Sequence, residues 1–275
     1  MDTNKQIVRK WYEKLEFPAH FDALFEDVLN RKEIPANCVL ARYNELMDLH
    51  GDVELNIMML LYLCEELEQW FYSRGISEEI FLHTMKDLVL WAEDYLKQSG
   101  GVFGIAFEVL WLGTYYSGRL FRLGRLEFEK ATAWRDIPGT HIKNGDTYIS
   151  VHIPEGEAMT PEACQASIDM AMEIFPKHFP EHQFDSFICH TWMFDEQLKS
   201  VLSPNSNIVK FFDFFEVVNQ EESDEIIRHI FGNGSTRENI IDRPCNSSLT
   251  KWIVQTVKEN GKFYEGYGIR KVAKD

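Results

Sequence analysis

A strand–helix–strand pattern between residues 145 and 195 constrains the fold of this chain more than any other segment does. Residues 147–153 (TYISVHI) form a short β-branched run, which stops at the turn-forming residues 154–156 (PEG). Residues 160–162 (TPE) have the composition of a helix start, and residues 184–194 (FDSFICHTWMF) form a second apolar run. Two strands joined by a helix favour a parallel pair with a right-handed crossover.

Several ionisable side chains fall near the carboxyl ends of these two predicted strands, where parallel units usually bind their ligands. His152, Glu155 and His190 are the candidates for accepting a proton, because imidazole titrates near neutrality and burial can raise the pKa of a carboxyl group. The alternatives are histidines that hydrogen-bond within a packed face and a solvated loop glutamate. The simplest role for Asp195 is to cap the helix that follows it.

The composition of the chain restricts the classes of ligand it can take. Its 275 residues are 45% hydrophobic, enough for a substantial core, and 28 Lys and Arg against 44 Asp and Glu give a net charge of −16. Nucleic acids and anionic membranes both require a cationic surface. We therefore expect neither nucleic acid nor membrane as a partner, although a local basic patch could bind one phosphate-bearing small molecule.

The five cysteines are widely spaced and form no CxxC pair, so we expect free thiols and no metal site. The N-terminal residues 1–15 are polar and lack the apolar core of a signal peptide, and the longest apolar run, residues 57–64, is too short to span a bilayer. These features predict a cytoplasmic protein.

Two differently patterned halves suggest two domains. Residues 1–117 show apolar positions at helical spacing and predict an all-helical domain. The predicted helical stripes cover residues 7–15, 21–29, 35–47, 52–70, 77–95 and 103–111, the third ending near His50–Gly51. Residues 118–275 instead alternate between β-type runs and helices. The predicted strands are 119–128, 147–153, 184–194, 207–218 and 262–272, with helices at 160–175, 195–202, 223–231 and 247–260.

A basic cluster and a Cys–His neighbour pair are the remaining candidates for chemistry. Arg119, Arg122 and Arg125 could meet a phosphate, or they could form ion pairs with nearby glutamates. Cys189 precedes His190, but adjacent strand residues point to opposite faces, so these two cannot act as a pair. A hydrolase that uses Cys189 with another histidine is a further functional hypothesis, weaker than the two that follow from the family resemblance described below.

Five segments of the second half carry a resemblance to a known family. They are FRLGRLEFE (121–129), ISVHIPEGEAMTPEA (149–163), CHTWMFD (189–195), PNSNI (204–208) and the stretch from Thr250 to GYG (266–268). With these segments the chain resembles a family of bacterial acyltransferase-domain proteins, in which a helical N-terminal domain precedes a C-terminal domain similar to GNAT acyltransferases. The resemblance implies an α+β protein with a GNAT-like mixed-sheet α/β domain after the helical one.

The resemblance also implies a function and a binding mode. In the GNAT fold the fourth and fifth strands diverge, and the pantetheine arm of acyl-coenzyme A lies between them. Residues 147–153 and 184–194 would be these strands. Backbone amides of the following loop and helix would hold the diphosphate. The implied binding residues for acetyl-CoA or another acyl-CoA are Ile153, Gly156, Thr160, Glu162, Arg122 and Arg125. The expected reaction is acyl transfer to a small-molecule or peptide amine.

The loop departs from the pattern of the superfamily, which is a basic, glycine-rich run of the form Q/R-x-x-G-x-G/A. Residues 154–159 (PEGEAM) contain one glycine and two carboxylates. This departure motivates the second hypothesis, a non-catalytic ligand-binding or sensor protein on a degenerate GNAT-like scaffold.

Overall fold

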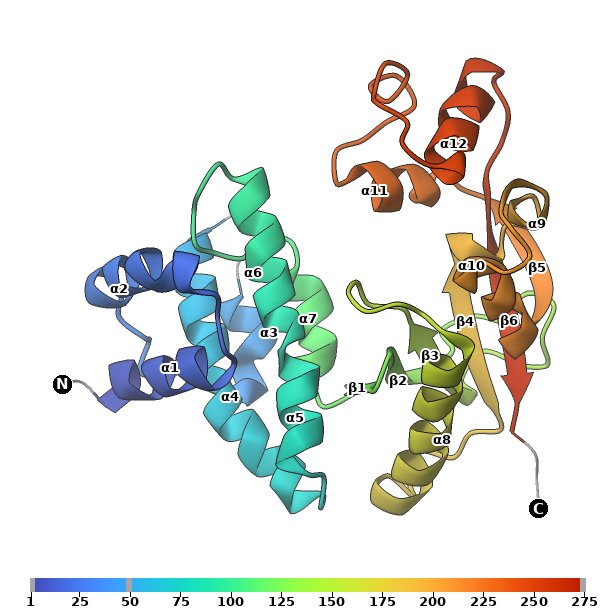
Figure 1. Ribbon diagram of the computed structural model, residues 1–275. Coiled ribbons are helices and arrows are strands. Elements are labelled where there is room, and N and C mark those ends of the chain that lie inside the picture. The colour runs from blue at the N-terminus through green and yellow to red at the C-terminus, as the bar shows by residue number, and fades with distance from the viewer. Residues whose placement is uncertain (1–2, 48–50, 273–275) are drawn as a thin grey trace. The chain divides into compact units, whose positions relative to one another are not determined.

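The computed structural model describes residues 3–47 and 51–272 and divides the chain into two compact units, Met1–Leu123 and Gly124–Asp275. Where the structure describes it, the first unit consists of helices with one short strand at its end, and the second contains a mixed sheet flanked by helices (Figure 1). The α+β fold class expected from the sequence is therefore confirmed. Among the described residues, none of the helices is both long and apolar enough to cross a membrane.

The first unit packs its helices around α4, a 21-residue helix whose apolar side chains are largely buried. Its helices are α1 (Thr3–Lys14), α2 (Asp22–Arg31), α3 (Tyr43–Leu46), α4 (Val53–Ser73), α5 (Glu78–Met85), α6 (Asp87–Gln98) and α7 (Val109–Tyr116), with short 3₁₀ helices η1 (Ala19–Phe21) and η2 (Leu40–Arg42) and the strand β1 (Leu120–Leu123). Aromatic rings fill the core: Phe71 lies between Phe81 and Phe121, with ring centroids 5.0 and 5.4 Å away.

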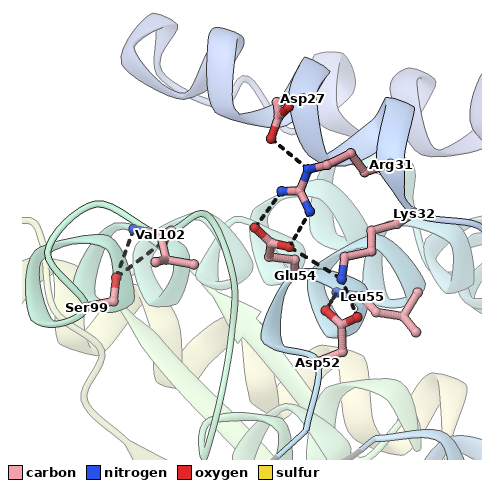
Figure 2. A network of polar contacts seen from close by, with 8 residues as sticks. All are labelled: Asp27, Arg31, Lys32, Asp52, Glu54, Leu55, Ser99 and Val102. Atoms are coloured by element: carbon pink, nitrogen blue, oxygen red, sulfur yellow. Dashed lines mark hydrogen bonds and ion pairs between the residues drawn. The ribbon is translucent and has the colours of Figure 1, made fainter.

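Helix α4 begins where the sequence predicts, because Asp52 accepts a hydrogen bond from the backbone N–H of Leu55 at 3.0 Å. The same carboxylate pairs with Lys32, and Glu54 accepts two hydrogen bonds from Arg31, at 2.8 and 3.1 Å (Figure 2). This network joins the end of α2 to the start of α4 at the surface, where such pairs contribute little stability.

The second unit is built on five strands in the order β2-β3-β4-β6-β5. They are β2 (Leu126–Thr132), β3 (Thr147–His152), β4 (Ser186–Thr191), β5 (Glu216–Glu222) and β6 (Tyr264–Lys271). Helix α8 (Pro161–His178) connects β3 to β4, which are parallel, while the other neighbours are antiparallel. The predicted strand–helix–strand unit is therefore present.

Shorter helices follow β4, and several of them contribute to an apolar cluster. They are η3 (Trp192–Phe194), α9 (Leu198–Val201), α10 (Asn207–Phe211), η4 (Phe212–Phe214), α11 (Glu225–Phe231) and α12 (Ser248–Lys258). The buried members of the cluster are Trp192, Leu198, Ile226, Ile227, Ile240, Ile253, Val257 and Phe263.

Several boundary predictions are wrong. Residues 35–39 are not helical, and the predicted strand at 184–194 ends at Thr191, directly before η3. The stripe at 77–95 is two helices separated at Lys86, and the last helix of the first unit, α7, starts only at Val109. Residues 119–128 are not one strand, because the turn at 124–125 separates β1 from β2. Residues 207–211 form α10, since Ser206 caps a helix there. The predicted end of the third stripe near His50 lies outside the described residues.

Candidate active site

The hydrogen-bonded ladder between the parallel strands β3 and β4 ends before the strands do. Its pairs are Ile149↔Phe187, Ser150↔Ile188 and Val151↔Cys189. Beyond them, His190 and Thr191 of β4 continue to pair with Tyr267 and Gly266 of β6 on the other side. The two strands are thus paired over three positions, and His152 of β3 and His190 and Thr191 of β4 lie past the last pair.

The register places both candidate histidines on one face of the sheet. His152 and His190 each follow the last pair of the parallel ladder, and side chains alternate between faces along a strand. The opposite face is covered by α8: Phe128 contacts Phe175 of α8 with ring centroids 6.5 Å apart, and Arg270 donates to Gln165. His152 and His190 therefore point away from α8, at the start of the unpaired strand ends.

His152 forms a hydrogen bond with Glu129 of β2. Nε2 of His152 lies 3.1 Å from Oε2 of Glu129, and the imidazole N–H donates because a carboxylate only accepts. The Glu129 side chain is 13% exposed and that of His152 28%. The directly paired residue on β2 is Glu127, which is buried. A carboxylate in this position fixes the orientation of the imidazole ring and directs its Nε2–H toward β2.

His190 stacks on Tyr267 of β6, with ring centroids 3.9 Å apart and planes inclined by 14°. Burial lowers the pKa of His190 from its ordinary value of 6.5, and Arg135 lowers it further, whereas Glu265 and Glu221 oppose this shift. Nε2 of His190 is 3.6 Å from a carboxylate oxygen of Glu265. The face thus presents two imidazoles beside acidic side chains from β2 and β6.

The loop after β3 leads into the N-terminus of α8. Thr160 caps this helix by accepting a hydrogen bond from the N–H of Ala163 at 3.2 Å, as its sequence predicts. Gly156 has a φ of +124°, a conformation that residues with a side chain rarely adopt. The N–H groups and the dipole at a helix N-terminus favour an anion such as a phosphate.

Arg125, in the turn between β1 and β2, reaches this loop. Its Nε donates to the carbonyl oxygen of Glu157 at 2.7 Å and its Nη1 to that of Pro154 at 2.8 Å. The residue is buried. The guanidinium therefore contacts the loop through carbonyl oxygens on both sides of Gly156.

The structure brings some other sequence candidates to this region and leaves others elsewhere. Ile153 and Glu162 flank the loop, and Glu155 is exposed on it. Burial lowers the pKa of His229, and the charge of Glu155 opposes this shift, so Glu155 lies near that histidine. Arg122 belongs to the first unit, where its N–H donates to Thr84 and its Nη1 lies 3.9 Å from Asp87. Its assignment as a phosphate ligand stays a prediction.

Asp195 is fully buried and has a structural role. Its carboxylate accepts hydrogen bonds from the N–H groups of Gln197 and Tyr264, both at 3.0 Å. It therefore joins the segment before α9 to the start of β6. The predicted capping role is wrong, because α9 begins only at Leu198 and its N-cap residue is Gln197, with no side-chain cap.

The four buried thiols are poor nucleophiles. Burial raises the pKa of Cys164 to about 11 and those of Cys38 and Cys64 to about 12, and the pKa of Cys189 is higher still. Cys189 also faces α8, opposite to His190. Within residues 3–47 and 51–272, no three His, Cys, Asp or Glu side chains are grouped as metal ligands would be.

Sequence reasoning missed three residues of the site: Glu129, Tyr267 and Ser167. The first two are recognisable only once the strand register is known. Ser167 of α8 accepts hydrogen bonds from the N–H groups of Arg125 and Leu126, at 2.8 and 3.2 Å. In the sequence, Gly124 interrupts the run FRLGRLEFE and indicates the turn between β1 and β2 that Ser167 binds.

A mixed sheet in which a helix connects two parallel central strands, with a loop and the helix N-terminus after the first of them, is the arrangement that the resemblance to GNAT-like domains implies. Family models agree: the model of the N-acyltransferase N-terminal domain matches residues 9–118, and that of the GNAT-like C-terminal domain matches residues 120–270. The chain belongs to the N-acyltransferase family that combines these two domains.

Solved structures show the same fold along nearly the whole chain. An acyltransferase in complex with decanoyl-CoA and teicoplanin is 22% identical, with a TM-score of 0.78 over 97% of this chain and 88% of that one. An acyltransferase in complex with decanoyl-CoA is 24% identical, with a TM-score of 0.76 and the same coverage. No curated protein sequence matches the chain.

Proposed function

We propose that this protein transfers an acyl group from acyl-CoA to the amine of a small molecule or peptide. The observation that carries the proposal is the early end of the ladder between β3 and β4, at Val151↔Cys189, beside the N-terminus of α8. A pantetheine arm would lie between the unpaired strand ends, with the diphosphate near residues 154–162. The complexes of similar acyltransferases with CoA, decanoyl-CoA and octanoyl-CoA support this donor.

The acidic face around the two histidines fits an amine acceptor. Glu129 and Glu265 lie near His152 and His190, and Glu127 is buried opposite His152. Carboxylates attract a protonated amine and would repel an acceptor of negative charge. A similar acyltransferase was solved in complex with both decanoyl-CoA and teicoplanin, which supports a small molecule or peptide as the second substrate.

His152 is the best-placed general base. With its Nε2–H donated to Glu129, the basic nitrogen of the ring is Nδ1, which would take a proton from the amine as its nitrogen attacks the thioester carbonyl. The amide C–N bond forms, the C–S bond breaks, and the proton passes to the departing thiolate. Between these two transfers the proton would stay on His152, whose ring is held in place by Glu129. His190 would assist on the neighbouring strand, and Glu155 remains a weaker candidate because it is exposed.

A panel of donors tests the proposal: acetyl-, octanoyl- and decanoyl-CoA with primary amines, followed by thiol release and product mass. His152→Gln should lower kcat by about 10²- to 10⁴-fold, the range for loss of a general base, while donor binding is kept. His141→Gln is the matched control, since that histidine pairs with Asp185. Wild-type protein that releases no thiol with any donor and amine would contradict the proposal.

The second candidate, a ligand-binding or sensor protein without turnover, is favoured by one observation. The loop beside the proposed diphosphate site carries two exposed carboxylates, Glu155 and Glu157. Such a protein would bind CoA thioesters in calorimetry yet form no acylated amine, so the same panel separates the two functions.

A further inference from the structure

The loop at residues 154–158 has one glycine and no basic residue, whereas a phosphate-binding loop of the superfamily is glycine-rich and basic. Such a loop binds an anion when its N–H groups point to the ligand and its carbonyl oxygens point away, because carbonyl oxygens repel phosphate oxygens. In this chain another part of the fold must therefore control the direction of the carbonyl groups.

Arg125 is placed to do this. Its two hydrogen bonds, to Pro154 O at 2.8 Å and Glu157 O at 2.7 Å, hold the loop carbonyls before and after Gly156. Both bonds come from one rigid, planar guanidinium, which fixes the two carbonyls relative to each other. The positive φ of Gly156 allows the chain to reverse between them.

Arg125 is itself held by α8. Its N–H donates to Oγ of Ser167 at 2.8 Å, and the Ser167 hydroxyl donates to the carbonyl of Ala163 at 2.9 Å, in the first turn of the helix. The β1–β2 turn, the loop and the start of α8 thus form one hydrogen-bonded unit centred on a buried arginine.

The charge of Arg125 also acts at the start of α8. It lowers the pKa of Cys164, against the larger effect of burial, which raises it. A buried cation close to the first helical turn adds to the positive end of the helix dipole. It would offset part of the unfavourable charge of Glu155 and Glu157.

We infer that Arg125 is a positioning residue for the donor: it replaces the glycine-rich loop of the superfamily by holding the carbonyls of Pro154 and Glu157 away from the diphosphate of acyl-CoA. The inference rests on the proposed function. It assigns to Arg125 an action through the loop and not a direct contact with phosphate. It also explains why a loop with two carboxylates can serve a polyanionic donor.

The test compares two donors that carry the same acyl group. One is the acyl-CoA that reacts best in the panel, and the other is its N-acetylcysteamine thioester, which has no diphosphate. Arg125→Gln should lower kcat/KM for acyl-CoA by about 10- to 100-fold, the effect of losing hydrogen bonds to a charged group, mainly through KM. The value for the truncated thioester should stay within about threefold, because that donor never meets the loop.

Two further variants separate positioning from general stability. Arg125→Lys keeps the charge but not the planar fork, and should recover part of the loss. Arg270→Gln removes an arginine that contacts α8 at Gln165, and should affect both donors equally or not at all. If the truncated thioester reacts slowly, calorimetry can replace the kinetics. The dissociation constants of CoA and of pantetheine are then compared between the wild-type protein and Arg125→Gln.

The outcomes are distinguishable. Equal losses with both donors in Arg125→Gln, or no loss with either, would overturn the role of Arg125 while leaving acyl transfer intact. A wild-type protein that uses neither donor would remove the proposed function, and this inference with it.

Discussion

His190 shows how one residue links the site to the stability of the fold. It stacks on Tyr267, and burial lowers its pKa below the ordinary value of 6.5. A histidine with a lowered pKa stays neutral at neutral pH, which is the state that can accept a proton. The same shift has a cost in acid, because the unfolded chain binds the proton more readily than the folded one.

This cost predicts a pH dependence of unfolding. The free energy of unfolding should fall as the pH drops below 6.5, and His190→Gln should reduce that fall, because glutamine does not titrate. Urea unfolding of both proteins at pH 7.5 and 5.5 measures the difference. His141→Gln, at a half-exposed position, provides the control. An unchanged pH dependence in His190→Gln would show that His190 does not carry the effect.

At the scale of elements, the turn between β1 and β2 positions much of the site. Gly124 has a φ of +69°, and a Cβ at this position would lie 2.9 Å from Oγ of Ser167. Because Gly124 has no side chain, the turn approaches α8 closely enough for Oγ of Ser167 to accept hydrogen bonds from the N–H groups of Arg125 and Leu126. The geometry of Arg125 therefore depends on the glycine before it.

Gly124→Ala should destabilise the protein by about 1–3 kcal/mol, since it combines an unfavourable φ with a close contact to Ser167. Gly145→Ala is the matched control: it has a φ of +92°, and an added Cβ would meet nothing within 4 Å. Chemical denaturation of both variants compares the costs. If the two are equal, the close approach to Ser167 contributes nothing.

The elements also show what the sequence could and could not predict. The strand–helix–strand unit and the caps at Asp52 and Thr160 follow from local patterns, and the structure confirms them. Alternation along the strands correctly separates Cys189 from His190. The pairing of His152 with Glu129 could not be predicted, because it depends on the register between β2 and β3, which packing and turn geometry set together.

At the scale of the whole molecule, the chain combines a helical N-terminal domain with a GNAT-like domain and carries a net charge of −16. A polyanionic donor has to bind such a protein against its overall charge. The local features that favour it are the N-terminus of α8 and the buried guanidinium of Arg125. Donor binding is therefore expected in one region, past the last pair of β3 and β4.

A crystal structure of the complex with a non-hydrolysable acyl-CoA analogue tests this central claim most directly. We predict that the pantetheine arm lies between β3 and β4 beyond Val151 and Cys189, with the diphosphate at residues 154–162 and the acyl carbonyl near His152. An analogue bound elsewhere, or strands that pair along their full length in the complex, would contradict the account.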